Sequence, residues 1–143
     1  WQTSYSMSFP RLRPCKGETD PATVLEDRDL VQLLCAFRIL SHELELSIST
    51  RESATLRENL LPLGVTTLSA GSKTNPGGYA VEEKSLEQFE ISDDRSPKEI
   101  FDLLQNKGYD PVWKDWDHAY NLTERGNNPL SRKEKVIRTT VLT

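Results

Sequence analysis

Hydrophobic residues recur at helical spacing in three stretches of the chain, and each stretch predicts an amphipathic helix. The helices are expected over residues 23–41, 52–61 and 97–107. Thr23 and Glu26 have the spacing of a capping box at the start of the first helix. The three apolar stripes consist of Leu25, Leu30, Leu33, Leu34, Phe37 and Leu40, then Leu56, Leu60 and Leu61, then Ile100, Leu103 and Leu104.

Residues that stop or start helices agree with these limits. Pro62 and Gly64 end the second helix. Ser96 and Glu99 form another capping box at the start of the third helix, and Gly108 stands where its C-terminal cap is expected.

The sequence also predicts four strands, over residues 4–9, 43–50, 65–71 and 109–116. The clearest is the second, in which apolar and polar residues alternate. Its apolar members are Leu44, Leu46 and Ile48, and its polar members are Glu45, Ser47 and Ser49.

The alternation of strands and helices predicts an α/β fold with parallel strands, built from about four βα units in which successive strands lie side by side. Four such units are half of an eight-unit (β/α)8 barrel of the TIM type, but a small open sheet has the same pattern. We assign residues 1–117 to this unit. Residues 118–143 are polar, lack clear periodicity and are expected to form a loosely attached tail.

Composition narrows the functional classes. The net charge is −4 and the basic residues are scattered until the tail, so nucleic acid is not an expected partner. No apolar run approaches the length of a membrane span, and the N-terminal sequence does not look like a signal peptide. Two cysteines suit a reducing compartment, so we expect a cytoplasmic protein. We expect a chain that starts at Trp1 to be a processed, cloned or truncated piece.

Functional groups of βα folds gather where the strands end. Ser47 and Ser49 lie on one face of the second strand, and Arg51 continues the same row. Small hydroxyls leave room for a ligand and offer hydrogen bonds, while a guanidinium binds a carboxylate with two parallel bonds. The row therefore indicates a pocket for a small anion or an amino acid. The alternative is that Arg51 pairs with an acidic neighbour on the next loop.

Other candidates are weaker. Arg11 and Arg13 follow the first strand and have the charge to hold an anion, although arginines beside a proline turn are common on surfaces. Gly77 and Gly78 permit close approach of the backbone to a ligand, with an ordinary turn as the simpler explanation. No metal site is expected, because the cysteines and histidines lack ligand spacing. These residues are Cys15, Cys35, His42 and His118.

Several long strings together resemble one family, the 2-iminoacetate synthases, which are the tyrosine lyases of thiamine thiazole biosynthesis. The strings are SFPRLRPC, LSISTRESATLREN, GVTTLSAGSKTNPGGY, LEQFEISDDRSP and GYDPVWKDWD. They run from about Ser4 to Asp117 and are similar to the C-terminal half of such enzymes.

The resemblance implies a radical S-adenosylmethionine enzyme with a (β/α)8 barrel. Such enzymes cleave the Cα–Cβ bond of L-tyrosine to give p-cresol and dehydroglycine, which feeds thiazole synthase. It also implies that Arg51 binds the tyrosine carboxylate, with Ser49 near the amino group and Ser47 a further candidate. The two arginines and two glycines named above are carried over only as residues near cofactor or substrate at the barrel mouth.

One departure from the family is decisive for the cofactors. Members hold a [4Fe–4S] cluster with a C-x-x-x-C-x-x-C loop, and neither Cys15 nor Cys35 belongs to such a motif. We therefore expect S-adenosylmethionine and the cluster to belong to the parent enzyme and not to be held by this chain alone. By itself the chain is expected to be inactive.

Two alternatives stay open. The first is a non-catalytic interaction or structural fragment that binds thiazole synthase. The second is the related tyrosine lyase that matures iron-only hydrogenase, which shares the STRES and PGGY strings. The expected partners are L-tyrosine, thiazole synthase and an N-terminal half-barrel, or a second copy of the chain paired through exposed strand edges.

Overall fold

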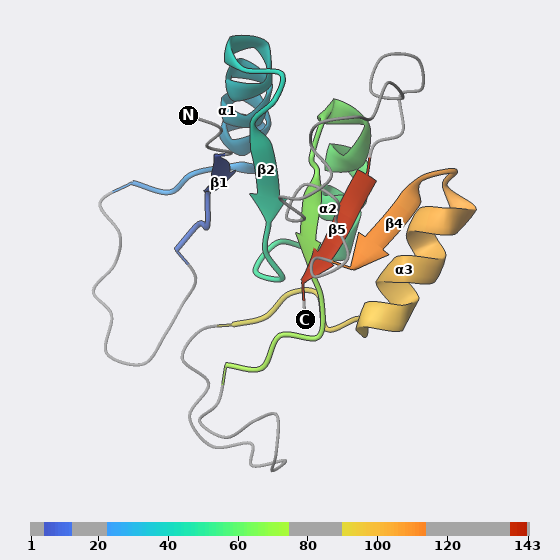
Figure 1. The fold of residues 1–143 in the computed structure, drawn as a ribbon. Helices are drawn as coiled ribbons and strands as arrows, with labels where there is room; N and C mark the ends of the chain where they lie inside the picture. The colour runs from blue at the N-terminus through green and yellow to red at the C-terminus, as the bar shows by residue number, and fades with distance from the viewer. Residues whose placement is uncertain (1–4, 13–22, 75–89, 114–137, 143) are drawn as a thin grey trace, which may run out of the picture.

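The computed structural model describes residues 5–12, 23–74 and 90–113, together with the backbone of 138–142 (Figure 1). The strands are β1 Ser6–Ser8, β2 Glu45–Ile48, β3 Thr67–Ser69, β4 Asp110–Trp113 and β5 Arg138–Leu142. The α-helices are α1 Asp27–Leu40, α2 Ala54–Leu60 and α3 Pro97–Asn106, and a 3-10 turn, η1 Leu61–Leu63, continues α2.

All strand pairs are parallel, which confirms the predicted α/β class with parallel strands. The five strands have the order β1-β2-β3-β5-β4. The first three lie side by side as expected. The expected pairing of the third with the fourth strand is wrong, because β5 lies between β3 and β4 and pairs with both.

Strand β5 belongs to the stretch 118–143 that the sequence predicts as a polar tail. Residues 138–142 depart from that prediction by joining the sheet. Their sequence RTTVL contains three β-branched residues in succession, which favour an extended backbone. The run is too short to show an apolar–polar period, so its residues alone do not identify it as a strand.

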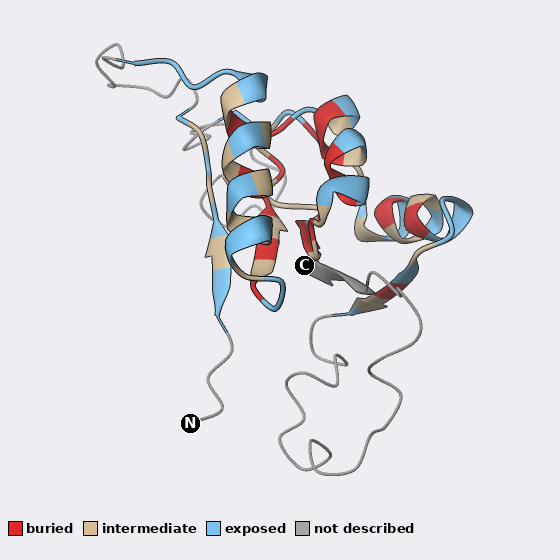
Figure 2. Ribbon diagram, turned by 90° about the horizontal axis from the view of Figure 1, so that it is seen from above, coloured by how far each residue is buried: buried red, intermediate tan, exposed pale blue. Residues whose placement is uncertain are grey.

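The three α-helices lie on one side of the sheet (Figures 1 and 2). Buried positions gather where the helices meet the strands, as the red segments of Figure 2 show. The alternation of β2 produces this core directly, because Leu46 and Ile48 are buried while Glu45 and Ser47 are half-buried. The buried hydrophobic residues are Leu30, Leu34, Leu44, Leu46, Ile48, Leu56, Leu60, Leu61, Val65, Leu68, Ala70, Ile100 and Leu104.

The start of α1 differs from the prediction. The helix begins at Asp27, and its capping box joins Glu26 to Asp29 instead of Thr23 to Glu26. The usual capping box has Ser or Thr at its first position, so the sequence indicates Thr23, whereas two acidic residues form the box in the structure. The last residue of the helix, Leu40, is 79% exposed and does not belong to the buried stripe.

The start of α3 agrees with the prediction. Ser96 accepts a hydrogen bond from the N–H of Glu99, and the Glu99 carboxylate accepts one from the N–H of Ser96 at 2.8 Å. Pro97 occupies the first turn. Beyond the helix, Gly108 has a φ of +82°, the left-handed conformation expected of a glycine there.

An ion-pair network joins α2 to the loop that precedes α3. The side chains of Arg57 and Asp93 are both 1% exposed and form a salt bridge. Arg95 donates to the same carboxylate at 2.8 and 2.7 Å and also pairs with Glu58 at 2.8 Å. Lys107 completes the network through a contact of 3.0 Å with Glu58. Helices α2 and α3 are thus connected by charge as well as by packing.

Burial by itself would raise the pKa of Asp93, but the hydrogen bonds from Arg95 and the charge of Arg57 outweigh it. The pKa of this carboxyl group is therefore held below its usual 3.8. Lys107 and Arg95 likewise lower the pKa of Glu58. Both carboxylates are favoured in the folded chain, because each faces a cation there that it lacks in the unfolded chain.

Ser96→Ala removes the hydroxyl that caps α3 and is expected to lower the free energy of unfolding by about 1 kcal/mol. Urea denaturation followed by circular dichroism measures this difference. Lys98→Ala is the matched control, since Lys98 is an exposed residue of the same helix and its loss should change stability by less than about 0.5 kcal/mol. Equal unfolding midpoints for Ser96→Ala and the parent chain would contradict the capping role.

The lowered pKa of Asp93 predicts acid sensitivity. The folded chain binds fewer protons than the unfolded chain, so its stability is full above about pH 4 and falls as the pH drops through the folded pKa. Asp93→Asn should cost about 3 kcal/mol at neutral pH and show a shallower decline toward acid. Urea midpoints measured between neutral and strongly acid pH test this, with Lys98→Ala as a variant that removes no carboxylate. An unchanged acid slope in Asp93→Asn would refute the assignment.

Candidate functional site

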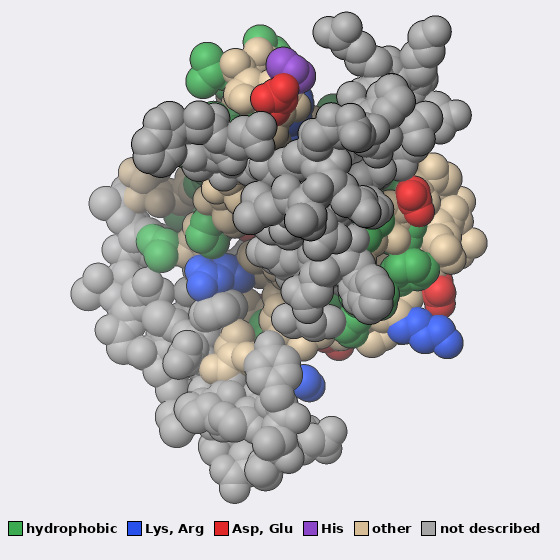
Figure 3. All heavy atoms as spheres, viewed as in Figure 1, with side chains coloured by type: hydrophobic (Ala, Val, Ile, Leu, Met, Phe, Trp, Pro, Cys, Tyr) green, Lys and Arg blue, Asp and Glu red, His purple; other side chains and the backbone are tan. Residues whose placement is uncertain are grey.

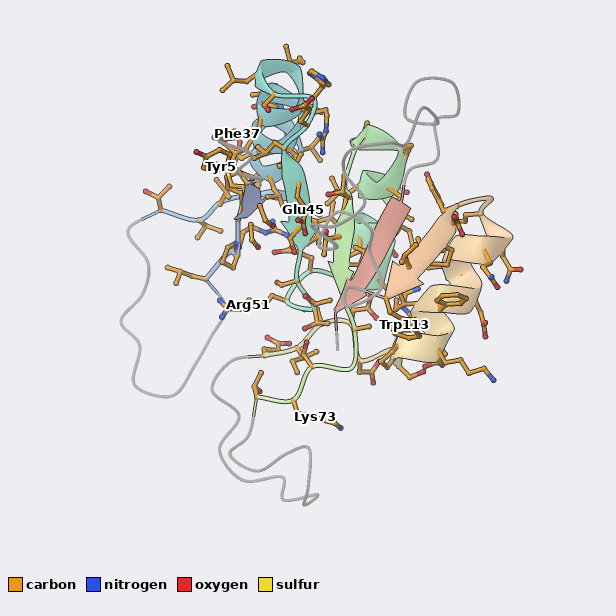
Figure 4. All side chains as sticks on the ribbon, viewed as in Figure 1. Tyr5, Phe37, Glu45, Arg51, Lys73 and Trp113 are labelled. Atoms are coloured by element: carbon orange, nitrogen blue, oxygen red, sulfur yellow. The ribbon has the colours of Figure 1, made fainter. Side chains whose placement is uncertain are left out.

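The carboxyl ends of β2 and β3 lie next to each other, because the strands are parallel and pair in register. Arg51 follows β2 and Lys73 follows β3, and Figure 4 shows both beyond the strand ends. This is the edge of a parallel sheet where ligands bind in α/β folds. The predicted row is therefore at an edge suited to a binding site.

Alternate burial continues from β2 through the turn that follows it. Ser47, Ser49 and Arg51 are half-buried, whereas Ile48 and Thr50 are buried. The structure thus gives the three candidate residues the shared period that the sequence predicts. What they bind stays a prediction.

The turn that carries Arg51 is held by its own backbone. Ser49 Oγ accepts the N–H of Arg51 at 3.3 Å, and the Ser49 carbonyl accepts the N–H of Glu52 at 3.4 Å. Ser53 then caps α2 by accepting the N–H of Leu56. The chain therefore passes from strand to helix through a short hydrogen-bonded turn that begins at Ser49.

A second segment reaches this turn from far along the sequence. The N–H groups of Ser92 and Asp93 both donate to the carbonyl of Thr50, at 3.0 and 3.1 Å. Arg57 donates to the carbonyl of Ser69 at the end of β3. The loop before α3 and the first turns of α2 therefore contact the ends of both strands.

Arg11 makes contacts that the sequence did not predict. Its Nε lies 3.1 and 3.0 Å from the two carboxylate oxygens of Glu52, and Nη1 lies 2.7 Å from Asp27. The hydrogen bond to Glu52, followed by the pair with Asp27, raises the pKa of Arg11. The Arg11 guanidinium is thus engaged with two carboxylates of this chain, and any part in ligand binding would have to work alongside them.

Three charged residues of this region were not predicted from the sequence, namely Glu52, Arg57 and Asp93. All three are buried. Glu52 has a detectable signal, because it continues the buried series of Ile48 and Thr50. Arg57 stands beside Leu56 and one turn before Leu60, which places a charge on an apolar helix face.

A cavity of about 510 Å³ lies between the end of β1 and the start of α1. Its lining includes Arg11, Leu12, Leu25 and Asp27. The cavity therefore adjoins the ion pairs of Arg11. Arg51 is not among the residues that line it.

The other residues that the sequence singles out add little evidence for a binding site. Arg13, Gly77 and Gly78 lie outside the described residues. Within the described ranges there is no group of three or more histidine, cysteine or acidic residues arranged to hold a metal ion. Cys35 is half-buried on α1.

The described surface carries charges of both signs. In the space-filling view, the lysine and arginine side chains that are visible lie apart from one another among other residue types (Figure 3). Among the helices described, none combines the length and apolarity that crossing a membrane requires.

Comparison with known proteins identifies close relatives. The chain is 54% identical over 117 residues to 2-iminoacetate synthase of Escherichia coli and 53% identical to that of Salmonella typhimurium. Each match covers 82% of this chain and 31% of the relative. The chain thus spans about a third of the length of the curated relatives it matches.

A solved structure is also similar. It is HydG, a maturase of the [FeFe]-hydrogenase, with 37% sequence identity and a TM-score of 0.66. The match covers 73% of this chain and 23% of HydG. Residues 8–110 match the Biotin and Thiamin Synthesis associated domain, which includes all of β2, β3 and the three helices. The chain therefore belongs to the Biotin and Thiamin Synthesis associated domain family.

Proposed function

We propose that this chain supplies the tyrosine-binding side of a radical S-adenosylmethionine tyrosine lyase of the 2-iminoacetate synthase type. The complete enzyme would cleave the Cα–Cβ bond of L-tyrosine to p-cresol and dehydroglycine. The observation that carries the proposal is the row of Ser47, Ser49 and Arg51, which shares one period at the carboxyl end of β2. The 54% identity to 2-iminoacetate synthase supports the choice of reaction.

In this proposal Arg51 binds the substrate carboxylate with two parallel hydrogen bonds, which fix the plane of the carboxylate as well as its position. Ser49 lies near the amino group, and Ser47 lines the same pocket. Each residue orients the substrate and none breaks a bond. The reacting groups belong to the rest of the enzyme.

The residues present do not fit the iron–sulfur cluster of such an enzyme. The sequence holds two cysteines, and the described one, Cys35, is half-buried on α1, remote in sequence from the strand ends. A cluster bound through three thiolates cannot be built from these residues. We therefore infer that the cluster and S-adenosylmethionine are held by the rest of the complete enzyme.

The edges of the described sheet support the proposal of a partner that pairs through its own strands. Strands β1 and β4 are the two edges of the described sheet, and the edge strands of a parallel half-barrel are where the remaining strands would pair. An N-terminal half-barrel is the proposed occupant. A second copy of this chain is the alternative that the sequence also predicts, and thiazole synthase remains a proposed partner of the complete enzyme.

The hydrogenase maturase is a second candidate, supported by the TM-score of 0.66 to HydG. The 54% identity to 2-iminoacetate synthase exceeds the 37% to HydG and favours the thiamine enzyme. A fragment with an interaction role alone is the third candidate, and reconstitution separates it from the other two.

Reconstitution tests the proposal directly. The chain is mixed with the N-terminal part of E. coli 2-iminoacetate synthase that it does not match, then supplied with iron, sulfide, reductant, S-adenosylmethionine and tyrosine. We expect p-cresol from the mixture and none from either part alone, measured by chromatography. If the two parts form a complex and yield no p-cresol while the complete E. coli enzyme does, the chain has an interaction role instead.

Arg51→Ala is expected to weaken tyrosine binding by about 100-fold in the reconstituted enzyme, because a charge-assisted bidentate contact is lost. Arg51→Lys should recover only part of this loss, since an ammonium cannot form the two parallel bonds. Isothermal titration measures both. Arg28→Ala, on the exposed surface of α1, is the matched control and should bind like the parent chain. An affinity of Arg51→Ala within twofold of that control would remove Arg51 from the site.

A further inference from the structure

Asp93 is a buried carboxylate that the proposed tyrosine-binding row does not use. It lies in the loop directly before Ser96, the residue that caps α3. In space it lies against the end of β2, because the N–H groups of Ser92 and Asp93 both donate to the carbonyl of Thr50. Asp93 therefore lies against the residue that precedes Arg51, where it can influence the placement of Arg51.

The peptide group between Thr50 and Arg51 is held on both of its sides. Its carbonyl oxygen accepts the N–H groups of Ser92 at 3.0 Å and Asp93 at 3.1 Å, and its N–H donates to Ser49 Oγ at 3.3 Å. A peptide group is planar, so fixing both ends fixes the direction in which the Arg51 backbone leaves it. The loop at residues 92–93 thus helps to fix the backbone position from which the Arg51 side chain extends.

The side chain of Asp93 holds this loop in place. Its carboxylate accepts hydrogen bonds from Arg57 of α2 and from Arg95, and it also accepts the backbone N–H of Arg95 at 3.3 Å. Arg57 donates in addition to the carbonyl of Ser69. One carboxylate therefore connects the ends of β2 and β3 to the helix between them.

We propose that Asp93 is a positioning residue for Arg51, which acts by holding the 92–93 loop against the Thr50 carbonyl. The proposal rests on the proposed function, in which Arg51 binds the tyrosine carboxylate. Bidentate recognition requires a guanidinium placed to within about 0.5 Å. Loss of the Asp93 carboxylate would release the loop and leave the charges of Arg57 and Arg95 without their shared partner.

The first measurement is tyrosine affinity in the reconstituted enzyme. Asp93→Asn is expected to bind tyrosine about tenfold more weakly than the parent, and Asp93→Glu, which keeps the charge, should recover part of that loss. Glu58→Gln is the matched control, because Glu58 also pairs with Arg95, and within the described part of the chain its ionic partners are Arg95 and Lys107, neither of which belongs to a strand end. Its affinity should stay within about twofold of the parent.

The second measurement does not depend on tyrosine. Amide hydrogen exchange of the full chain, followed by NMR, reports the Arg51 N–H directly. We expect this amide to exchange about tenfold faster in Asp93→Asn and at the parent rate in Glu58→Gln. A structural role alone would accelerate exchange throughout the core in proportion to lost stability, whereas a positioning role accelerates the Arg51 amide beyond that level.

The outcomes separate this proposal from the proposed function. If the parent enzyme binds no tyrosine, the proposed function fails, and the exchange of the Arg51 amide alone decides whether Asp93 positions that residue. If Asp93→Asn is folded and changes neither affinity nor exchange, Asp93 has no positioning role. Should Asp93→Asn not fold, Arg95→Gln removes a half-exposed partner of the same carboxylate and is judged by the same two readings.

Discussion

The buried pair of Arg57 and Asp93 is the interaction on which the arrangement of the strand ends depends. Burying a carboxylate without a partner is very unfavourable. Here the guanidinium groups of Arg57 and Arg95 both donate hydrogen bonds to the carboxylate of Asp93. The pair requires α2, the loop before α3 and the carbonyl of Ser69 to occupy fixed relative positions. Hydrophobic packing tolerates small shifts of these elements, whereas hydrogen bonds with directional geometry do not.

Much of the fold follows from local patterns in the sequence. The alternation in β2 identifies its buried face, and the serine–proline–glutamate string identifies the first turn of α3, because both depend on residues within one turn or one strand. The start of α1 was misplaced because two acidic residues, Glu26 and Asp29, form its capping box, whereas Thr23 and Glu26 match the usual Ser/Thr-to-Glu spacing. Strand β5 was missed because its position depends on pairing with β3 and β4 and not on any pattern of its own.

The candidate site also has a part that the sequence predicts and a part that it does not. The row that leads to Arg51 was predictable, as it lies on one strand and continues its period of two. The contacts of Asp93 with Thr50 and of Arg11 with Glu52 were not, because each joins segments that are distant in the sequence. A buried charge on an apolar face, such as Arg57, indicates that a partner must exist, but a single sequence does not say which acidic residue it is.

The place of β5 in the sheet has a consequence for how the chain folds. Strand β4 pairs only with β5 among the described strands, and β5 follows both of its neighbours, β3 and β4, in the sequence. During synthesis β1, β2 and β3 can associate as soon as each is made, whereas β4 has no partner among the described strands until residues 138–142 are made. The sheet is therefore completed by an interior strand that is made after both of its neighbours, and its pairing with β3 joins segments distant in the sequence.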